Sequence, residues 1–184
     1  MNPPNILTLS RFVMAVVLVA CLSITFPGFM IAAFVIFVVA ALTDALDGHL
    51  ARNIYGCTDF GKLMDPLADK VLTAAAFIGF VELDVMPAWM VTLILSREFM
   101  VTGLRLLAAD KGIVLAAGTW GKHKTIWQMV FIGAVLLLGC FKPLENFQTY
   151  FWWAGLFVTA LSIWSGWHYF QQNMSLLTGA TSKK

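Results

Sequence analysis

The sequence predicts an all-α membrane protein, a polytopic bundle of six transmembrane helices. Of its 184 residues, 60% are hydrophobic and only 12% are charged, whereas soluble domains are about half apolar and about a quarter charged. Because a water-soluble fold of this size could not bury so much apolar surface, lipid is expected to be the solvent for much of it. We therefore expect a single membrane domain over residues 1–184.

Six segments are long and apolar enough, or nearly so, to cross a bilayer, which takes about 20 residues. Gly, Pro and charged residues separate them, as is typical between helices. No repeat of fixed period is visible in the sequence. The predicted spans are 7–26, 29–49, 64–83, 86–108, 121–141 and 149–170.

Lys and Arg residues gather at one end of the predicted bundle, and the opposite end has Lys142 alone. Positive residues mark the cytoplasmic side of membrane proteins, so an even number of spans places both termini in the cytoplasm. The net charge of +2 offers no general attraction for nucleic acid. The basic residues at the crowded end are Arg52, Lys62, Lys111, Lys122, Lys124, Lys183 and Lys184.

Four aspartates occur at the adjoining ends of the second and third predicted helices. Asp44 and Asp47 are three residues apart, and Asp65 and Asp69 are four apart, so each pair shares one helical face. If the two helices pack antiparallel, the four carboxylates converge and repel each other unless cations lie between them. All-oxygen ligation suits Mg²⁺ or Mn²⁺, and two such ions about 4 Å apart stabilise phosphoryl displacement.

Residues around these aspartates fit the same chemistry. Gly48 and Gly61 let a backbone or ligand approach closely, and Arg52, about two helical turns beyond the first aspartate, is placed to bind a phosphate through two hydrogen bonds. Alternatively, the aspartates could form salt bridges with Arg52, Lys62 and Lys70 that only hold the helices together. Four acids at this regular spacing exceed what that role requires.

The stretch from Asp44 to Asp69 reads D-x2-D-G-x2-A-R-x8-G-x3-D-x3-D. It resembles, without a missing position, the signature of the CDP-alcohol phosphotransferase family. The resemblance implies that Asp44, Asp47 and Asp65 are metal ligands. It also implies that Asp69 both contacts metal and takes the proton from the attacking hydroxyl.

The same resemblance implies contacts with the CDP-linked donor lipid. Asn5 and Thr8, in the segment before the first predicted helix, would otherwise be interpreted as helix-capping residues. The family also implies a homodimer. The predicted donor contacts are Asn5, Thr8, Gly48, Arg52, Thr58 and Gly61.

Three motifs in the second half of the chain resemble the pattern of phosphatidylglycerophosphate synthases, in which the acceptor is glycerol 3-phosphate. They are S-R-E at 96–98, T-G-L-R at 102–105 and G-K-H-K-T at 121–125. An acceptor with its own phosphate needs a cationic pocket, which we expect Arg97, Arg105, Lys122 and Lys124 to form. Alternatively, the two lysines are positive-inside anchors and Arg97 pairs with an aspartate of the cluster.

Together these features predict transfer of the phosphatidyl group of CDP-diacylglycerol to glycerol 3-phosphate, with CMP as the leaving group. The protein is expected in a bacterial cytoplasmic membrane, in contact with lipid, with its active site on the cytoplasmic side. The same chemistry with inositol phosphate, serine or phosphatidylglycerol as acceptor is the nearest alternative. A divalent-cation transporter is a remote one, because intramembrane acids also mark ion paths, but such proteins often contain repeats and bind ions near the midplane.

Overall fold

The computed structural model describes residues 3–24, 26–50, 59–110, 112–113, 115 and 118–174; within these ranges the side chains of 3–8, 44–50, 59–66, 69 and 110 are not described. The described residues form six α-helices and no strand, which confirms the all-α class. The elements are α1 (Pro3–Ser23), α2 (Phe29–Leu50), α3 (Asp59–Glu82), α4 (Ala88–Asp110), α5 (Thr119–Phe141), the short 3-10 helix η2 (Leu144–Phe147) and α6 (Gln148–Gln172).

Two helices begin earlier than predicted. Helix α1 starts at Pro3 rather than at residue 7, so Asn5 lies within it as Thr8 does. Helix α3 starts at Asp59 rather than at residue 64, and therefore also includes Gly61. The prediction followed apolar composition, whereas a helix needs only its backbone hydrogen bonds, and proline is tolerated in a first turn because its missing N–H would have no partner there.

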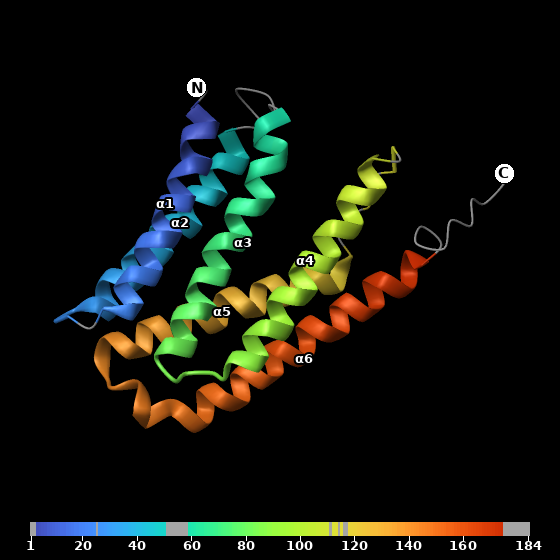
Figure 1. Cartoon of the computed structure of the whole chain (residues 1–184). Coiled ribbons are helices and arrows are strands. Elements are labelled where there is room, and N and C mark those ends of the chain that lie inside the picture. The colour runs from blue at the N-terminus through green and yellow to red at the C-terminus, as the bar shows by residue number, and fades with distance from the viewer. Residues whose placement is uncertain are drawn as a thin grey trace.

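The helices form two groups that α5 connects (Figure 1). Helix α1 packs against α2 and α3, α4 packs against α6, and α5 contacts both α2 and α6. The chain runs up and down, so the start of α1, the end of α2 and the start of α3 lie at one end of the molecule, and α4 also ends towards that side. This topology brings the aspartate-bearing ends of α2 and α3 to the same end.

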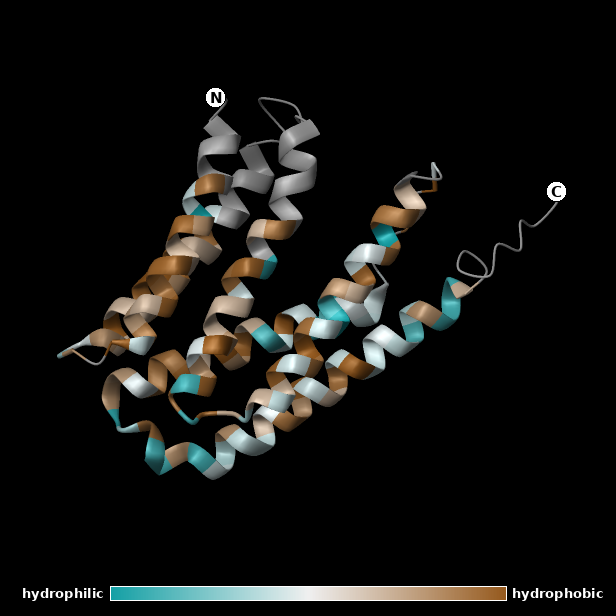
Figure 2. Cartoon of the chain, viewed as in Figure 1, coloured by the Kyte–Doolittle hydropathy of each residue, from teal (hydrophilic) through white to brown (hydrophobic). Residues whose placement is uncertain are grey.

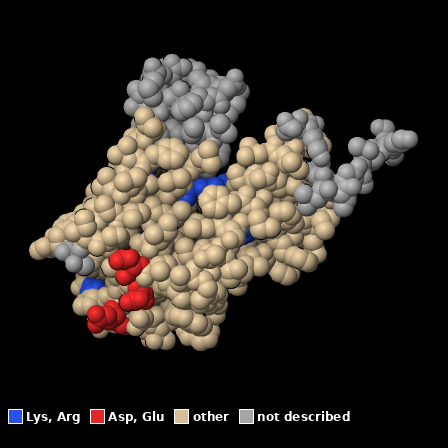
Figure 3. Space-filling view, in the orientation of Figure 1, with Lys and Arg blue, Asp and Glu red and all other residues tan. Residues whose placement is uncertain are grey.

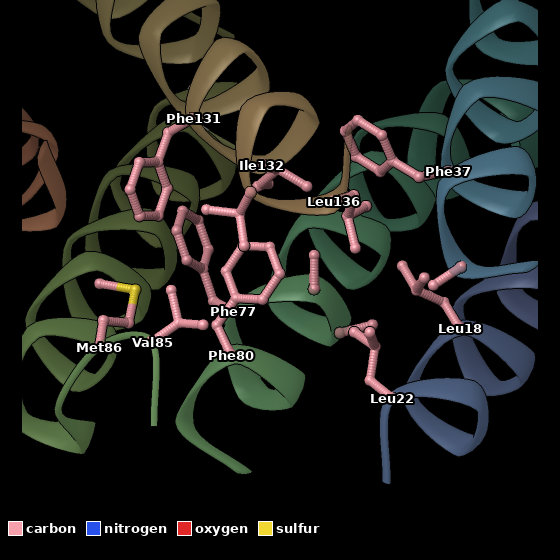
Figure 4. Packing of buried hydrophobic residues seen from close by; sticks show 14 of the residues in the cluster. Leu18, Leu22, Phe37, Phe77, Phe80, Val85, Met86, Phe131, Ile132 and Leu136 are labelled. Atoms are coloured by element: carbon pink, nitrogen blue, oxygen red, sulfur yellow. The ribbon is translucent and has the colours of Figure 1, made fainter. Parts of the chain in front are cut away.

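The core is centred on three phenylalanines from α3 and α5 (Figure 4). The rings of Phe77 and Phe131 stack with centroids 6.3 Å apart, and Phe80 meets Phe131 edge-on at 6.1 Å. Ile132 and Leu136, on the same side of α5, are fully buried beside them. These contacts fix α5 against α3 and so determine how the two groups of helices meet.

Small residues allow close helix contacts at two places. A Cβ on Gly79 of α3 would lie 2.8 Å from Cβ of Leu22 in α1, so only glycine fits there. Helix α6 buries a face of small residues, which lets neighbouring helices approach its backbone. These small buried residues of α6 are Gly155, Thr159, Ser162, Ser165 and Gly166.

Hydrophobic residues cover most of the length of the described helices, and hydrophilic ones gather at the α3–α4 and α5–α6 connections (Figure 2). Among the described residues one helix, Thr119–Phe141, is long and apolar enough to cross a membrane by length and composition, and Leu9–Ser23 and Phe29–Thr43 are shorter apolar stretches. Helix α4 is less apolar because it contains four charged residues, Arg97, Glu98, Arg105 and Asp110, from its middle to its end. The prediction of six spans stays a prediction.

Candidate functional site

A cavity of about 460 Å³ opens between α3, α4, α5 and α6. Figure 3 shows Lys and Arg side chains within a hollow between the two groups of helices. Glu98 is the one carboxylate among the described residues that line the cavity. We call this cavity the basic pocket, after the five basic residues in its wall: Lys70, Arg97, Arg105, Lys122 and Lys124.

Glu98 of α4 joins two of these basic residues. Arg97 donates from Nη1 to Glu98 Oε1 at 2.9 Å, and Nζ of Lys124 donates to the same oxygen. Lys124 and Glu98 are only 4% and 9% exposed, and buried charges of this kind are stable only when they are paired. Because one carboxylate serves two cations, this buried group keeps an excess positive charge that an anionic ligand would neutralise.

The side chain of Arg97 lies against the backbone of α6. A Cβ on Gly166 would come within 2.6 Å of Arg97 Cγ and 3.3 Å of its Nε. The missing side chain at Gly166 therefore provides the space that Arg97 occupies. Its buried Nε has no hydrogen-bond partner in the part of the chain that the structure describes.

Arg105 is held by Tyr169 of α6. Its Nε donates to the tyrosine hydroxyl at 3.0 Å, and its guanidinium carbon lies 5.3 Å from the centre of the ring. Tyr169 is itself buried in a small apolar cluster with Val101 and Leu104 of α4. Tyr169 thus holds the guanidinium of Arg105 at the wall of the basic pocket through both its hydroxyl and its ring.

The four residues predicted for the acceptor lie together in this pocket. Arg97 and Arg105, eight residues apart on α4, both line it, as expected for one helical face. Lys122 is exposed at its edge, whereas Lys124 is buried. Burial and pairing with Glu98 contradict the alternative in which Lys124 is an interfacial anchor; that alternative stays open for Lys122.

The residues predicted for the metal and the donor lie outside the described side chains. For most of these predicted residues the structure gives the backbone: Asp44 and Asp47 belong to the last turns of α2, and Asp65 and Asp69 to the first half of α3. Lys70, the next residue along α3, lines the basic pocket. The predicted residues without described side chains are Asn5, Thr8, Asp44, Asp47, Gly48, Gly61, Asp65 and Asp69, and Arg52 and Thr58 are not described at all.

The four predicted metal ligands, Asp44 and Asp47 of α2 and Asp65 and Asp69 of α3, fit a hard divalent cation, because they offer carboxylate oxygens alone. The ends of α2 and α3 that carry them lie at the same end of the molecule (Figure 1). Among the side chains that the structure does describe, no group of three His, Cys, Asp or Glu residues gathers as a metal site. The aspartate pairs are therefore the candidate ligands.

Several residues of the pocket wall were not predicted as site residues, and three of them carry polar groups that shape the pocket: Glu98, Gln128 and Tyr169. Glu98 could have been identified from the sequence, since a charge inside an apolar helix needs a partner. Gln128 follows Lys124 by four residues on α5, which places it on the same face. Tyr169 lies 64 residues from Arg105 in the sequence, and no local pattern points to that contact.

Comparison with known proteins gives matches over most of the chain. A family model described as CDP-alcohol phosphatidyltransferase matches residues 1–164. The CDP-diacylglycerol--glycerol-3-phosphate 3-phosphatidyltransferase of Bacillus subtilis is 39% identical over 190 aligned positions, covering 96% of this chain and 97% of that protein. A protein of the same name from Pseudomonas fluorescens is 32% identical over 174 positions, with 90% and 86% covered. A probable phosphatidylglycerophosphate synthase of Mycobacterium tuberculosis is 43% identical over 142 positions, with 74% and 66% covered.

Proposed function

The chain belongs to the CDP-alcohol phosphatidyltransferase family, and from that premise we propose that it transfers the phosphatidyl group of CDP-diacylglycerol to glycerol 3-phosphate. The products are phosphatidylglycerol phosphate and CMP. The observation that carries this proposal is the basic pocket, whose wall includes Lys70, the residue that follows Asp69 on α3. The names of the relatives from B. subtilis and P. fluorescens specify the same donor and acceptor.

The charge of the basic pocket favours an acceptor that carries its own phosphate. Five basic residues and only one described carboxylate line the pocket. A phosphate dianion binds such a set of cations through charge-assisted hydrogen bonds. Serine has no phosphate and would leave the buried positive charge of Arg97 and Lys124 uncompensated. We assign the acceptor phosphate to Arg97, Arg105, Lys122 and Lys124.

The donor is proposed to bind at the ends of α2 and α3. Asp44, Asp47, Asp65 and Asp69 would hold two Mg²⁺ or Mn²⁺ ions, whose positive charge would offset that of the donor diphosphate. The remaining donor contacts are proposed from the family signature. They are Asn5, Thr8, Gly48, Arg52, Thr58 and Gly61.

In the proposed reaction, Asp69 takes the proton from the terminal hydroxyl of glycerol 3-phosphate. The hydroxyl oxygen then forms a bond to the phosphorus that carries the diacylglycerol, and the bond from that phosphorus to the CMP oxygen breaks. Arg52 stabilises the charge that develops on the departing CMP. The acceptor supplies its own nucleophile, so no covalent intermediate with the enzyme is needed.

We propose that all six helices span a bacterial cytoplasmic membrane. They contain 21 to 25 residues, or about 32 to 38 Å at 1.5 Å per residue, and a bilayer core is about 30 Å thick. Large apolar side chains on separate helices are exposed, with Val16, Phe99 and Trp153 at 69%, 64% and 62%, and lipid would cover them at no cost. The basic pocket and both termini would face the cytoplasm, and two copies would form a homodimer.

A panel of acceptors tests the proposed reaction. Purified protein in detergent micelles receives CDP-diacylglycerol and Mg²⁺ with glycerol 3-phosphate, inositol phosphate, serine or phosphatidylglycerol, and CMP release is measured. We expect release with glycerol 3-phosphate at a rate well above the others. Preference for another acceptor would overturn the acceptor assignment alone, whereas no release with any acceptor would overturn the transfer reaction itself.

A further inference from the structure

Gln128 lies in the wall of the basic pocket, four residues after Lys124 on α5. It is 2% exposed, yet its Nε2 has no hydrogen-bond partner among the residues that the structure describes. Neighbouring polar groups of the pocket are paired: Lys124 donates to Glu98, and Arg105 donates to Tyr169. Gln128 therefore has a neutral amide nitrogen without a described partner, whereas Lys124 and Arg105 in the same wall are hydrogen-bonded.

A buried amide without a partner destabilises a protein, and such groups are rare in folded structures. A leucine or methionine would fill the same space in α5 at lower cost. The amide therefore points to a ligand that supplies the missing hydrogen bond when the pocket is filled. An unpaired polar group of this kind also discriminates strongly against a ligand that lacks the matching group.

The chemistry of the pocket indicates which part of the ligand Gln128 meets. A phosphorylated alcohol has two kinds of polar group, the phosphate and its hydroxyls, and the arginines and lysines match the phosphate. A neutral amide can donate from nitrogen and accept at oxygen, which suits a hydroxyl. Resting on the proposed function, we propose that Gln128 binds the secondary hydroxyl of the acceptor, which takes no part in the reaction, and so selects for it.

The test compares glycerol 3-phosphate with 3-hydroxypropyl phosphate, which keeps the phosphate and the reacting terminal hydroxyl but lacks the secondary one. CMP release gives kcat/KM for both acceptors in the wild type, in Gln128→Met and in Gln128→Leu. We expect the wild type to prefer glycerol 3-phosphate about 10- to 100-fold, as for one hydrogen bond left unmade in a buried site. Both variants should reduce this preference to about threefold or less.

A thermal unfolding measurement separates recognition from a structural role. Because Nε2 of Gln128 makes no hydrogen bond with the described residues, neither variant should unfold at a lower temperature than the wild type. Gln148→Met is the matched control, since Gln148 is exposed in a different pocket, at the start of α6; it should leave the preference unchanged.

Three results would overturn the inference while the proposed function stands. The first is a wild type that uses both acceptors equally well. The second is a preference for glycerol 3-phosphate that persists in both Gln128 variants. The third is an unfolding temperature of both variants below that of the wild type. If the wild type releases no CMP with either acceptor, the proposed function fails and the inference fails with it.

Discussion

Lys124 of α5 and Glu98 of α4 form an ion pair that is almost completely buried, although they are 26 residues apart in the sequence. The pair joins two helices across the wall of the basic pocket. Glu98 also accepts a hydrogen bond from Arg97, so it determines where two of the pocket's cations lie. Glu98 is thus a positioning residue, which acts on the acceptor through the cations it holds.

Replacing Glu98 with glutamine should destabilise the protein and weaken acceptor binding. The substitution leaves Arg97 and Lys124 as buried cations without a compensating charge, and breaking such a pair costs about 3 kcal/mol. Denaturant titration in detergent measures the free energy of unfolding, and CMP release gives KM for glycerol 3-phosphate. Glu145→Gln, at an exposed position near the far end of the bundle, is the control; equal stability of the two variants would contradict this role.

Gly166→Ala should displace the side chain of Arg97. The new Cβ would lie 2.6 Å from Arg97 Cγ, so the arginine must move away from its present position. Loss of one charge-assisted hydrogen bond, about 1.5 to 3 kcal/mol, raises KM for glycerol 3-phosphate about tenfold or more. Gly133→Ala, where a Cβ meets nothing within 4 Å, should leave KM unchanged, and a similar effect of both substitutions would exclude the proposed contact.

Tyr169→Phe should weaken acceptor binding moderately. It removes the hydroxyl that accepts from Arg105 Nε but keeps the ring beside the guanidinium. A hydrogen bond from a charged guanidinium contributes about 1.5 kcal/mol or more, so we expect KM for glycerol 3-phosphate to rise about tenfold, with KM for CDP-diacylglycerol unchanged. Tyr150→Phe, at a side chain 74% exposed, serves as the control. An equal rise in both KM values for Tyr169→Phe would point to a general structural effect instead.

Asp69→Asn should abolish turnover and leave binding of CDP-diacylglycerol largely intact. The amide retains the shape of the side chain but cannot take a proton from the acceptor hydroxyl. Binding is measured by the shift in unfolding temperature that the donor lipid causes, and turnover by CMP release. Asp84→Asn, in the turn that follows α3, should keep full activity. Turnover retained in Asp69→Asn would exclude it as the base.

Removal of divalent metal should stop CMP release completely, because four aspartates without cations repel both each other and the donor diphosphate. Treatment with EDTA followed by dialysis tests this, and addition of Mg²⁺ or Mn²⁺ should restore the rate. A matched addition of Na⁺ at the same ionic strength is the control for charge screening. Activity that persists after chelation would contradict the assignment of the four aspartates.

The sequence alone was sufficient to place six helices, because runs of about 20 apolar residues between Gly, Pro and charged stretches are a local property. It was also sufficient to place Arg97 and Arg105 on one face, since helical periodicity relates residues eight apart. It misplaced the starts of α1 and α3, because helical hydrogen bonding continues past the end of the apolar segment, and it did not identify Gln128 as a pocket residue.

Contacts between helices were decided by the tertiary structure. Arg97 has room only because Gly166 of α6 lies beside it, Arg105 is oriented by Tyr169, and Lys124 is buried because Glu98 is there to pair with it. Each of these contacts depends on how α4, α5 and α6 pack, and packing is set by the combined shape of side chains that are far apart in the chain. The sequence determined which residues could bind an anion, and the packing of the helices decided which of them share one pocket.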